Sequence, residues 1–503
     1  MKKESRSKKA LVNTASYLIG MIIEIIISLV IPRLILRKFG SGNNGLCSSI
    51  EQFLSYTSLL YLGLTGATRA ALYKPLSKND QKSVNSIMAA TQLFMKKVTV
   101  VTMLILIIFS CAYPLFVKSE FDWWYAASLT FIIGINTLFQ YYFAMSCRII
   151  LAADQRNYIL TIVDIMVLLL SSIVSVILIY TTESIHLVKV GATFAKALGP
   201  ILLYFYVRKH YNLDYSVAPD SNCLKQRRDA GAHSMAQFIN KNTDIVILTL
   251  FTNIKEVSVY TVYYLVVNGL NKIGTAISSG LEGAFGNIIA RNENESLKRN
   301  FSVYETLIYT ISSVIYTCCA ILILPFIRIY TIGVYDVSYD RAVFGYLVSI
   351  AGLYSTLRIP YQTIVQATGK YKDTRNGATL EAVINIILSI ILVNRFGLIG
   401  VTIGTIAAMC FRTTQYAIFT YKKIVKVSLK AYVERNIMMF LQIFSVLCIM
   451  HMLPKMEINS YFQWITYAVP VCLITTSVVI VTSLIFWKKD YKILMNIIKR
   501  ALR

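Results

Sequence analysis

Gly63-Leu64-Thr65-Gly66-Ala67 returns as Gly280-Leu281-Glu282-Gly283-Ala284, 217 residues later in a chain of 503 residues. Asp164, an acid inside an apolar run, is matched by Glu381 at the same separation. A short glycine motif alone carries little weight, because glycine and leucine are common in membrane helices. Two matches at one separation predict that a bundle of helices is duplicated within the chain, an organisation in which the ligand site lies between the halves.

The composition excludes a soluble protein. Hydrophobic residues make up 56% of the chain, with a mean hydropathy of +0.59, whereas soluble domains contain about 45–50%. The net charge of +25 does not indicate nucleic-acid binding, because no stretch is long enough for a soluble module; basic loops facing anionic lipid explain it. Nine cysteines without a CxxC pair and four histidines predict no metal site and no resident cofactor.

Apolar segments of about 20 residues, the length that spans a bilayer, occur fourteen times. The first is too long for the apolar part of a signal peptide, which has about 7–15 residues. The segment 231–252 is the most polar of the set. The predicted spans are 10–32, 45–68, 98–117, 124–147, 158–180, 187–207, 231–252, 257–280, 301–327, 342–366, 376–394, 398–421, 436–453 and 462–487.

The positive charges predict the topology. Most Lys and Arg residues fall in the two tails and in alternate loops, which places both termini in the cytoplasm. The sequence therefore predicts an all-α polytopic membrane protein with two parallel six-helix repeats and two extra helices. The predicted parts are an N-lobe (1–210), a cytoplasmic linker (211–230), a C-lobe (231–425) and a C-terminal segment (426–503) with a basic tail.

Four segments resemble those of the Wzx-type O-antigen and oligosaccharide flippases, the polysaccharide-exporting branch of the multidrug/oligosaccharidyl-lipid/polysaccharide (MOP) exporter superfamily. They are Asn13-Thr14-Ala15-Ser16-Tyr17-Leu18, the connection from Ile31-Pro32-Arg33 to Gly45-Leu46, the segment from Asn240 to Leu248, and Gln366-Ala367-Thr368-Gly369-Lys370. The resemblance covers nearly the whole chain.

This resemblance implies a flippase that moves undecaprenyl-diphosphate-linked oligosaccharide across the bacterial plasma membrane by alternating access, for cell-surface polysaccharide synthesis. It also implies membrane lipid, a polysaccharide polymerase and assembly proteins as partners. A multidrug or organic-cation antiporter and a peptidoglycan-precursor flippase of the same superfamily stay open. An enzyme is not expected, because no external loop is long and no Asp-x-Asp pair is present.

Basic residues inside the predicted spans are the candidates for substrate binding. Each costs about 2.5–3.5 kcal/mol at the centre of a bilayer, so we expect them to face a cavity or a counter-ion. Lys and Arg in a polar cavity would bind a diphosphate through charge-assisted hydrogen bonds. Snorkelling to the interface remains an alternative for Arg358 and Arg412. The candidates are Lys196, Lys241, Lys272, Arg358 and Arg412.

Acidic residues inside the spans have two open interpretations. They couple transport to protons or sodium ions, since burial raises the proton affinity of a carboxylate, or they are counter-ions of the buried cations. Lys241 and Asp244 are three residues apart and share a helix face. The candidate acids are Glu24, Asp164, Asp244 and Glu381.

Overall fold

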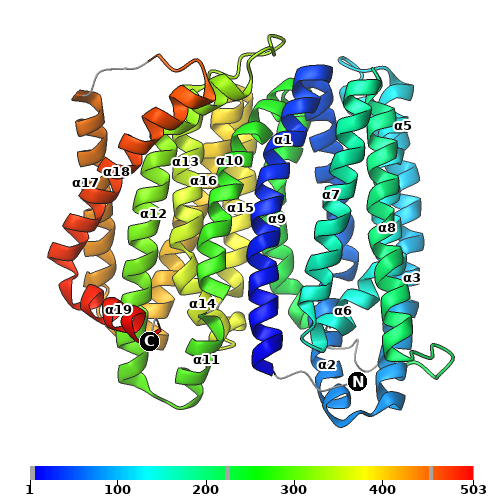
Figure 1. Cartoon of the computed structure of the whole chain (residues 1–503), viewed down its shortest axis with the longest axis horizontal. Helices are drawn as coiled ribbons and strands as arrows, with labels where there is room; N and C mark the ends of the chain where they lie inside the picture. The colour runs from blue at the N-terminus through cyan, green and yellow to red at the C-terminus, as the bar shows by residue number, and fades with distance from the viewer. Residues whose placement is uncertain (1–5, 221–226, 280, 453–456, 502–503) are drawn as a thin grey trace. The chain divides into compact units, whose positions relative to one another are not determined.

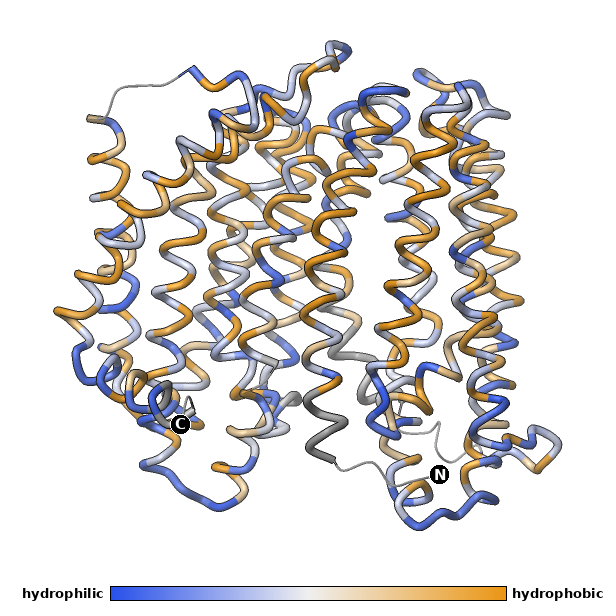
Figure 2. Tube along the Cα trace, viewed as in Figure 1, coloured by the Kyte–Doolittle hydropathy of each residue, from blue (hydrophilic) through white to orange (hydrophobic). Residues whose placement is uncertain are grey.

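The protein is an all-α polytopic membrane protein. The computed structural model describes residues 6–220, 227–279, 281–452 and 457–501, and within these ranges it contains helices and no strands. Nine helices in the described ranges are long and apolar enough to cross a membrane. Figure 2 shows apolar residues along the helices and hydrophilic residues gathered in many of the connections.

Contacts divide the chain into a first unit, Met1–Val259, and a second unit, Tyr260–Arg503. The boundary falls within α10 (Ile254–Ser279). It lies beyond α9 (Arg227–Phe251), which packs against α1 and α2 of the first unit. The lobes predicted from the repeat have a different boundary, at 211–230, and their limits stay a prediction.

The first unit contains two long helical hairpins and several short helices (Figure 1). α7 packs along α8, and α3 packs against α5, so the apolar faces of these helices are buried on one another. The elements are α1 (Arg6–Ser55), η1 (Tyr56–Tyr61), α2 (Leu64–Lys78), α3 (Gln81–Ala112), α4 (Pro114–Val117), α5 (Trp123–Phe139), η2 (Gln140–Ala144), α6 (Met145–Ala153), α7 (Asn157–Thr181), α8 (Ile185–Tyr211) and α9.

α1 is two helices joined at a single residue, Gly40, whose φ of 81° and ψ of 174° are not helical. The predicted span 10–32 lies on the first arm, and the predicted span 45–68 covers most of the second arm, η1 and the start of α2, but the loop predicted between the two spans is wrong. The chain stays helical on both sides of Gly40, because glycine alone adopts this φ without strain. The first arm packs on α7 through Gly20, and the second packs on α9, where Ser49 and Thr249 share a hydrogen bond of 2.8 Å.

The predicted span 124–147 is interrupted by the π-helix η2. A π-turn takes in one residue more than an α-turn, which changes the direction of the side chains that follow it. Here the following helix is α6, which carries Arg148. The interruption therefore sets which way Arg148 points.

The second unit is built around the long helix α12 (Asn294–Tyr330), which packs against α13, α14, α17, α18 and α19. α15 and α16 form an extensively packed hairpin. The predicted span 342–366 is divided into α13 and α14 at Arg358, before Pro360. The other elements are α11 (Glu282–Ala290), α13 (Ala342–Leu357), α14 (Ile359–Ala367), α15 (Tyr371–Phe396), α16 (Leu398–Phe419), η4 (Thr420–Val425), α17 (Lys430–Met452), α18 (Tyr461–Phe486) and α19 (Lys488–Ala501).

A buried ion pair connects α17 to α12. The Glu305 carboxylate is fully buried and accepts hydrogen bonds from Arg435 at 2.7 Å, Tyr421 at 2.6 Å and Tyr361 at 2.5 Å. Arg435 also lies 3.3 Å from Asp490 of α19. This network ties the C-terminal helices, which have no counterpart in the repeat, to the centre of the second unit.

The repeat predicted from the sequence has matching contacts in the two units. In the first, α2 packs on α6, and α7 packs on α8; in the second, α11 packs on α14, and α15 packs on α16. Each of the matched acids pairs with an arginine, since Asp164 of α7 pairs with Arg148, and Glu381 of α15 pairs with Arg358. The two arginines themselves are 210 residues apart rather than 217, so the repeat matches the acids and not the positions of their partners.

The repeated glycines act differently from one another. Gly63 has a φ of 80° at the start of α2, a conformation that favours glycine. Gly66 and Gly283 have no heavy atom within 4 Å of an added Cβ, so close packing does not require glycine at these two positions. Gly280 lies outside the described residues.

Gly45 provides a first test of the packing. An added Cβ would lie 2.0 Å from the backbone carbonyl oxygen of Ile254, which cannot move as a side chain would. Gly45→Ala should lower the free energy of unfolding by about 1–3 kcal/mol, because overpacking forces the backbone apart. The midpoint of thermal unfolding of the purified protein in detergent measures this. Gly66→Ala is the matched control, and an equal loss in both variants would contradict the role of the close approach.

Candidate functional site

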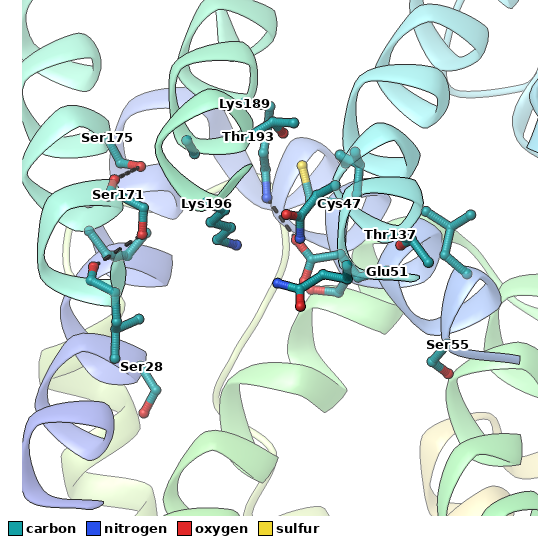
Figure 3. A pocket seen from close by; sticks show the side chains of 18 of the residues that line it. Ser28, Cys47, Glu51, Ser55, Thr137, Ser171, Ser175, Lys189, Thr193 and Lys196 are labelled. Atoms are coloured by element: carbon teal, nitrogen blue, oxygen red, sulfur yellow. Dashed lines mark hydrogen bonds and ion pairs between the residues drawn. The ribbon is translucent and has the colours of Figure 1, made fainter. Parts of the chain in front are cut away.

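A pocket of about 890 Å³ lies within the first unit. Both arms of α1 line it, together with residues of η1, α5, η2, α6, α7, α8 and α9. The break at Gly40 lets the two arms of α1 reach the same pocket: Glu24 and Ser28 come from one arm, Cys47 and Glu51 from the other. Figure 3 shows several of these side chains pointing into the pocket.

Helix α8 presents two cations to the pocket on one face. Lys189, Thr193 and Lys196 are spaced by four and three residues, which brings them onto the same side of a helix. Lys189 Nζ lies 3.0 Å from Glu51 Oε1. Lys196 forms no hydrogen bond or ion pair with any residue in the described ranges and projects between Glu51 and the serines of α7 (Figure 3). The unpaired ammonium is the natural first contact for an anion.

A third cation, Arg148 of α6, lines the pocket and is paired with a carboxylate outside the pocket wall. Its Nη1 donates to Asp164 Oδ2 at 2.9 Å, and its Nη2 contacts Asp164 Oδ1. Asp164 itself is not part of the pocket wall. This two-point pairing fixes the orientation of the guanidinium, so Asp164, predicted as a coupling acid or counter-ion, has the geometry of a counter-ion.

Most of the remaining polar lining is uncharged. Hydroxyl and amide side chains both donate and accept hydrogen bonds, as sugar hydroxyls require. They come from all sides of the pocket: Ser28, Asn44, Ser48, Ser55, Ser58, Asn136, Thr137, Gln140, Ser171, Ser172, Ser175 and Thr193. The acids that line the pocket are Glu24 and Glu51, against three cations. The pocket therefore suits a hydroxyl-rich ligand that carries an anionic group.

Two of the predicted cations lie in the second unit and surround Glu381. Arg358 Nη1 is 2.7 Å from Glu381 Oε1, and Arg412 Nε is 3.6 Å from Oε2. Arg412 is 1% exposed, donates to the Thr374 carbonyl at 2.8 Å, and lies 3.9 Å from the centre of the Tyr416 ring. Snorkelling is therefore wrong for Arg412, because its guanidinium is enclosed by protein.

The other predicted residues are placed as follows. Glu24 lines the pocket of the first unit, Asp244 is buried in α9, and Lys272 is half-buried in α10. The side chain of Lys241 lies outside the described residues, so its predicted pairing with Asp244 stays a prediction. Of the five predicted cations, the pocket contains Lys196.

Sequence reasoning missed Lys189 and Arg148. Lys189 lies seven residues before Lys196, and this spacing on one helix face was the signal that could have found it. Arg148 falls just beyond a predicted span, and only the π-helix brings it to the pocket. No cluster of metal-ligating side chains occurs among the residues that the structure describes.

No protein-family model and no curated protein sequence matches this chain. Solved structures do. The lipid II flippase MurJ in an inward closed conformation matches with a TM-score of 0.72 at 16% identity, covering 94% of this chain and 99% of MurJ.

Two multidrug transporters of the MATE family are also similar. An inward-facing transporter of the MOP superfamily matches with a TM-score of 0.64 at 13% identity, over 78% of this chain and 94% of that one. The eukaryotic MATE transporter AtDTX14 matches with a TM-score of 0.60 at 12% identity, over 86% of this chain and 98% of that one. These structures belong to transporters and a flippase, not to enzymes, and at these identities the likeness establishes the transporter fold that this chain shares with them.

Proposed function

We propose that this protein is a flippase for undecaprenyl-diphosphate-linked oligosaccharide, which it moves across the bacterial plasma membrane by alternating access for cell-surface polysaccharide synthesis. The proposal includes membrane lipid, a polymerase and assembly proteins as partners, and both termini in the cytoplasm. It places the chain in the Wzx-type branch that its sequence resembles. The MurJ-like fold supports the flippase class, since MurJ is a lipid II flippase.

The observation that carries the proposal is the lining of the pocket in the first unit. Three cations lie among many hydroxyl and amide side chains, and one of them, Lys196, has no ion pair or hydrogen bond with the residues that the structure describes. A diphosphate needs such cations to replace its water, and sugars need the uncharged hydrogen-bonding groups. An organic cation would instead be bound by acids and aromatic faces, and aromatic side chains in the lining are few: Tyr61, Tyr141 and Phe238.

Lys241, Lys272, Arg358 and Arg412 remain part of the proposal as further cations along the substrate path. Coupling to protons or sodium ions is also proposed, and Glu24 is the first acid to test because it lines the pocket. No resident cofactor is required.

Deletion of the gene tests the proposal. Mass spectrometry of the lipid extract, combined with a leaflet-accessibility assay, should find complete undecaprenyl-diphosphate oligosaccharide accumulating on the cytoplasmic side. Accumulation of lipid II would identify a peptidoglycan-precursor flippase instead. An unchanged lipid pool with normal surface polysaccharide would reject both and direct the next assays to drug efflux, as for the MATE transporters.

A further inference from the structure

The Lys189–Glu51 pair is unequally enclosed. The Lys189 side chain is 15% exposed and the Glu51 side chain 53%, although their charged atoms lie 3.0 Å apart. Glu51 faces the open pocket (Figure 3), so its carboxylate can turn into the pocket and stay hydrated, whereas the lysine has little space into which it can move. If an anion competes for Lys189, the carboxylate is the partner that leaves.

We propose that Glu51 is a displaceable counter-ion, which neutralises Lys189 while the pocket is empty and gives it up to the anionic group of the substrate. This inference rests on the proposed function, because it takes the substrate to be anionic. Lys196 makes the first contact, because it has no hydrogen bond or ion pair with the described residues and lies on the same face of α8 as Lys189. The anion then bridges Lys196 and Lys189, whose positions on one face of α8 point them at the same space.

The advantage lies in the empty protein. An alternating-access carrier has to return without its cargo. A closed pocket in which Lys189 as well as Lys196 lacks a counter-ion is costlier than one in which Glu51 neutralises Lys189, because each buried, unpaired charge adds to the cost. Glu51 takes the place of the cargo's charge during this step. Asp164 cannot have this role, because it holds Arg148 at two points and does not line the pocket.

The remaining charged groups near the pair do not replace Glu51. Arg148 is already compensated by Asp164. Cys47 lies one helical turn before Glu51 and brings no fixed charge at neutral pH. Glu24 lines the pocket from the other arm of α1 and has its own interactions. Lys189 therefore depends on Glu51 when no anion is bound.

Glu51→Gln separates two kinds of transport. The probe is undecaprenyl diphosphate bearing a fluorescent disaccharide, in proteoliposomes that contain the full chain. The variant should bind the probe about three- to tenfold more tightly, because nothing competes for Lys189. Exchange of labelled for unlabelled probe across the bilayer should continue, since it never uses the empty protein. Net flipping should fall on the order of 10- to 100-fold, since its return step leaves a charge uncompensated.

Glu183→Gln is the matched control, because Glu183 pairs with Lys38 outside the pocket and its side chain is 95% exposed. It should leave binding and both kinds of transport unchanged. Net flipping by Glu51→Gln at the wild-type rate, or loss of exchange together with net flipping, would overturn the proposal. If the wild-type protein neither binds nor flips the probe, the proposed function itself is rejected. This outcome needs the wild type alone, so it is distinguished from a failure of the proposal about Glu51.

A double variant keeps the test decisive if Glu51→Gln does not fold. Glu51→Gln with Lys189→Gln removes both charges of the pair, so the empty pocket again has the net charge of the wild type. The double variant should bind the probe more weakly than the wild type. At saturating probe, its rate of net flipping should be similar to its own rate of exchange. Net flipping that stays far slower than exchange in the double variant would contradict the role assigned to Glu51.

Discussion

Arg435→Met should destabilise the second unit by about 3–5 kcal/mol, the cost of leaving one partner of a buried ion pair without the other. Glu305 is fully buried and Arg435 is 5% exposed at the side chain, so no water can take over the lost contact. Tyr361 and Tyr421 also donate hydrogen bonds to Glu305, which reduces the loss of stability, but they supply no positive charge. Thermal and denaturant unfolding of the purified protein in detergent would measure it.

Two further variants isolate the cause. Lys298→Met removes an exposed ion pair from α12, the helix that carries Glu305. Lys298 lies 2.7 Å from Glu295, whose side chain is 88% exposed. The substitution should cost less than about 1 kcal/mol. Arg435→Met with Glu305→Gln should be more stable than Arg435→Met alone, because the unpaired charge is gone. Equal losses for Arg435→Met and Lys298→Met would show that the buried network does not hold α17 in place.

Lys196→Gln should reduce flipping of the lipid-linked oligosaccharide by about 10- to 100-fold. A hydrogen bond to a charged group contributes about 1.5–3 kcal/mol, and about 1.4 kcal/mol changes an equilibrium constant tenfold. Because Lys196 has no partner in the described structure, its replacement breaks no ion pair and should leave the unfolding midpoint unchanged. The readout is leaflet accessibility of the lipid-linked sugars in cells that carry only the variant.

Lys196→Arg should retain most of the activity, and Lys38→Gln is the control for loss of a positive charge outside the pocket. Activity of Lys196→Gln at the wild-type level would remove Lys196 from the substrate path. Reduced activity accompanied by a lower unfolding midpoint would assign the residue to folding rather than to binding.

The helical segments could be predicted because long apolar runs have few alternatives in a membrane protein. All fourteen predicted spans are helical over most of their described length. The connection after the first span was predicted as a loop because residues 33–44 are less apolar, yet they are helical except at Gly40. Hydropathy reports burial in lipid, and it does not report where a backbone bends.

Charge pairing was harder to predict than position. Asp164 and Glu381 were found as acids in apolar runs, but their arginine partners lie 16 and 23 residues away, outside the helices that carry the acids. Glu305 and Arg435 are 130 residues apart. Which residues pair at such separations depends on tertiary packing. Lys189 and Lys196, in contrast, lie on a single helix, and their seven-residue spacing alone predicts that they share a face.

The π-helix at Gln140–Ala144 has a consequence for comparing this chain with related sequences. A π-turn accommodates one residue more than an α-turn over nearly the same rotation about the axis, so removing one residue from this stretch would restore a regular α-helix and leave the later side chains of α6 facing almost as before. Arg148 would then keep its place at the pocket and beside Asp164. A homologue with a one-residue gap here therefore keeps its cation in register, so an alignment gap at this point marks a change of helix geometry rather than of binding chemistry.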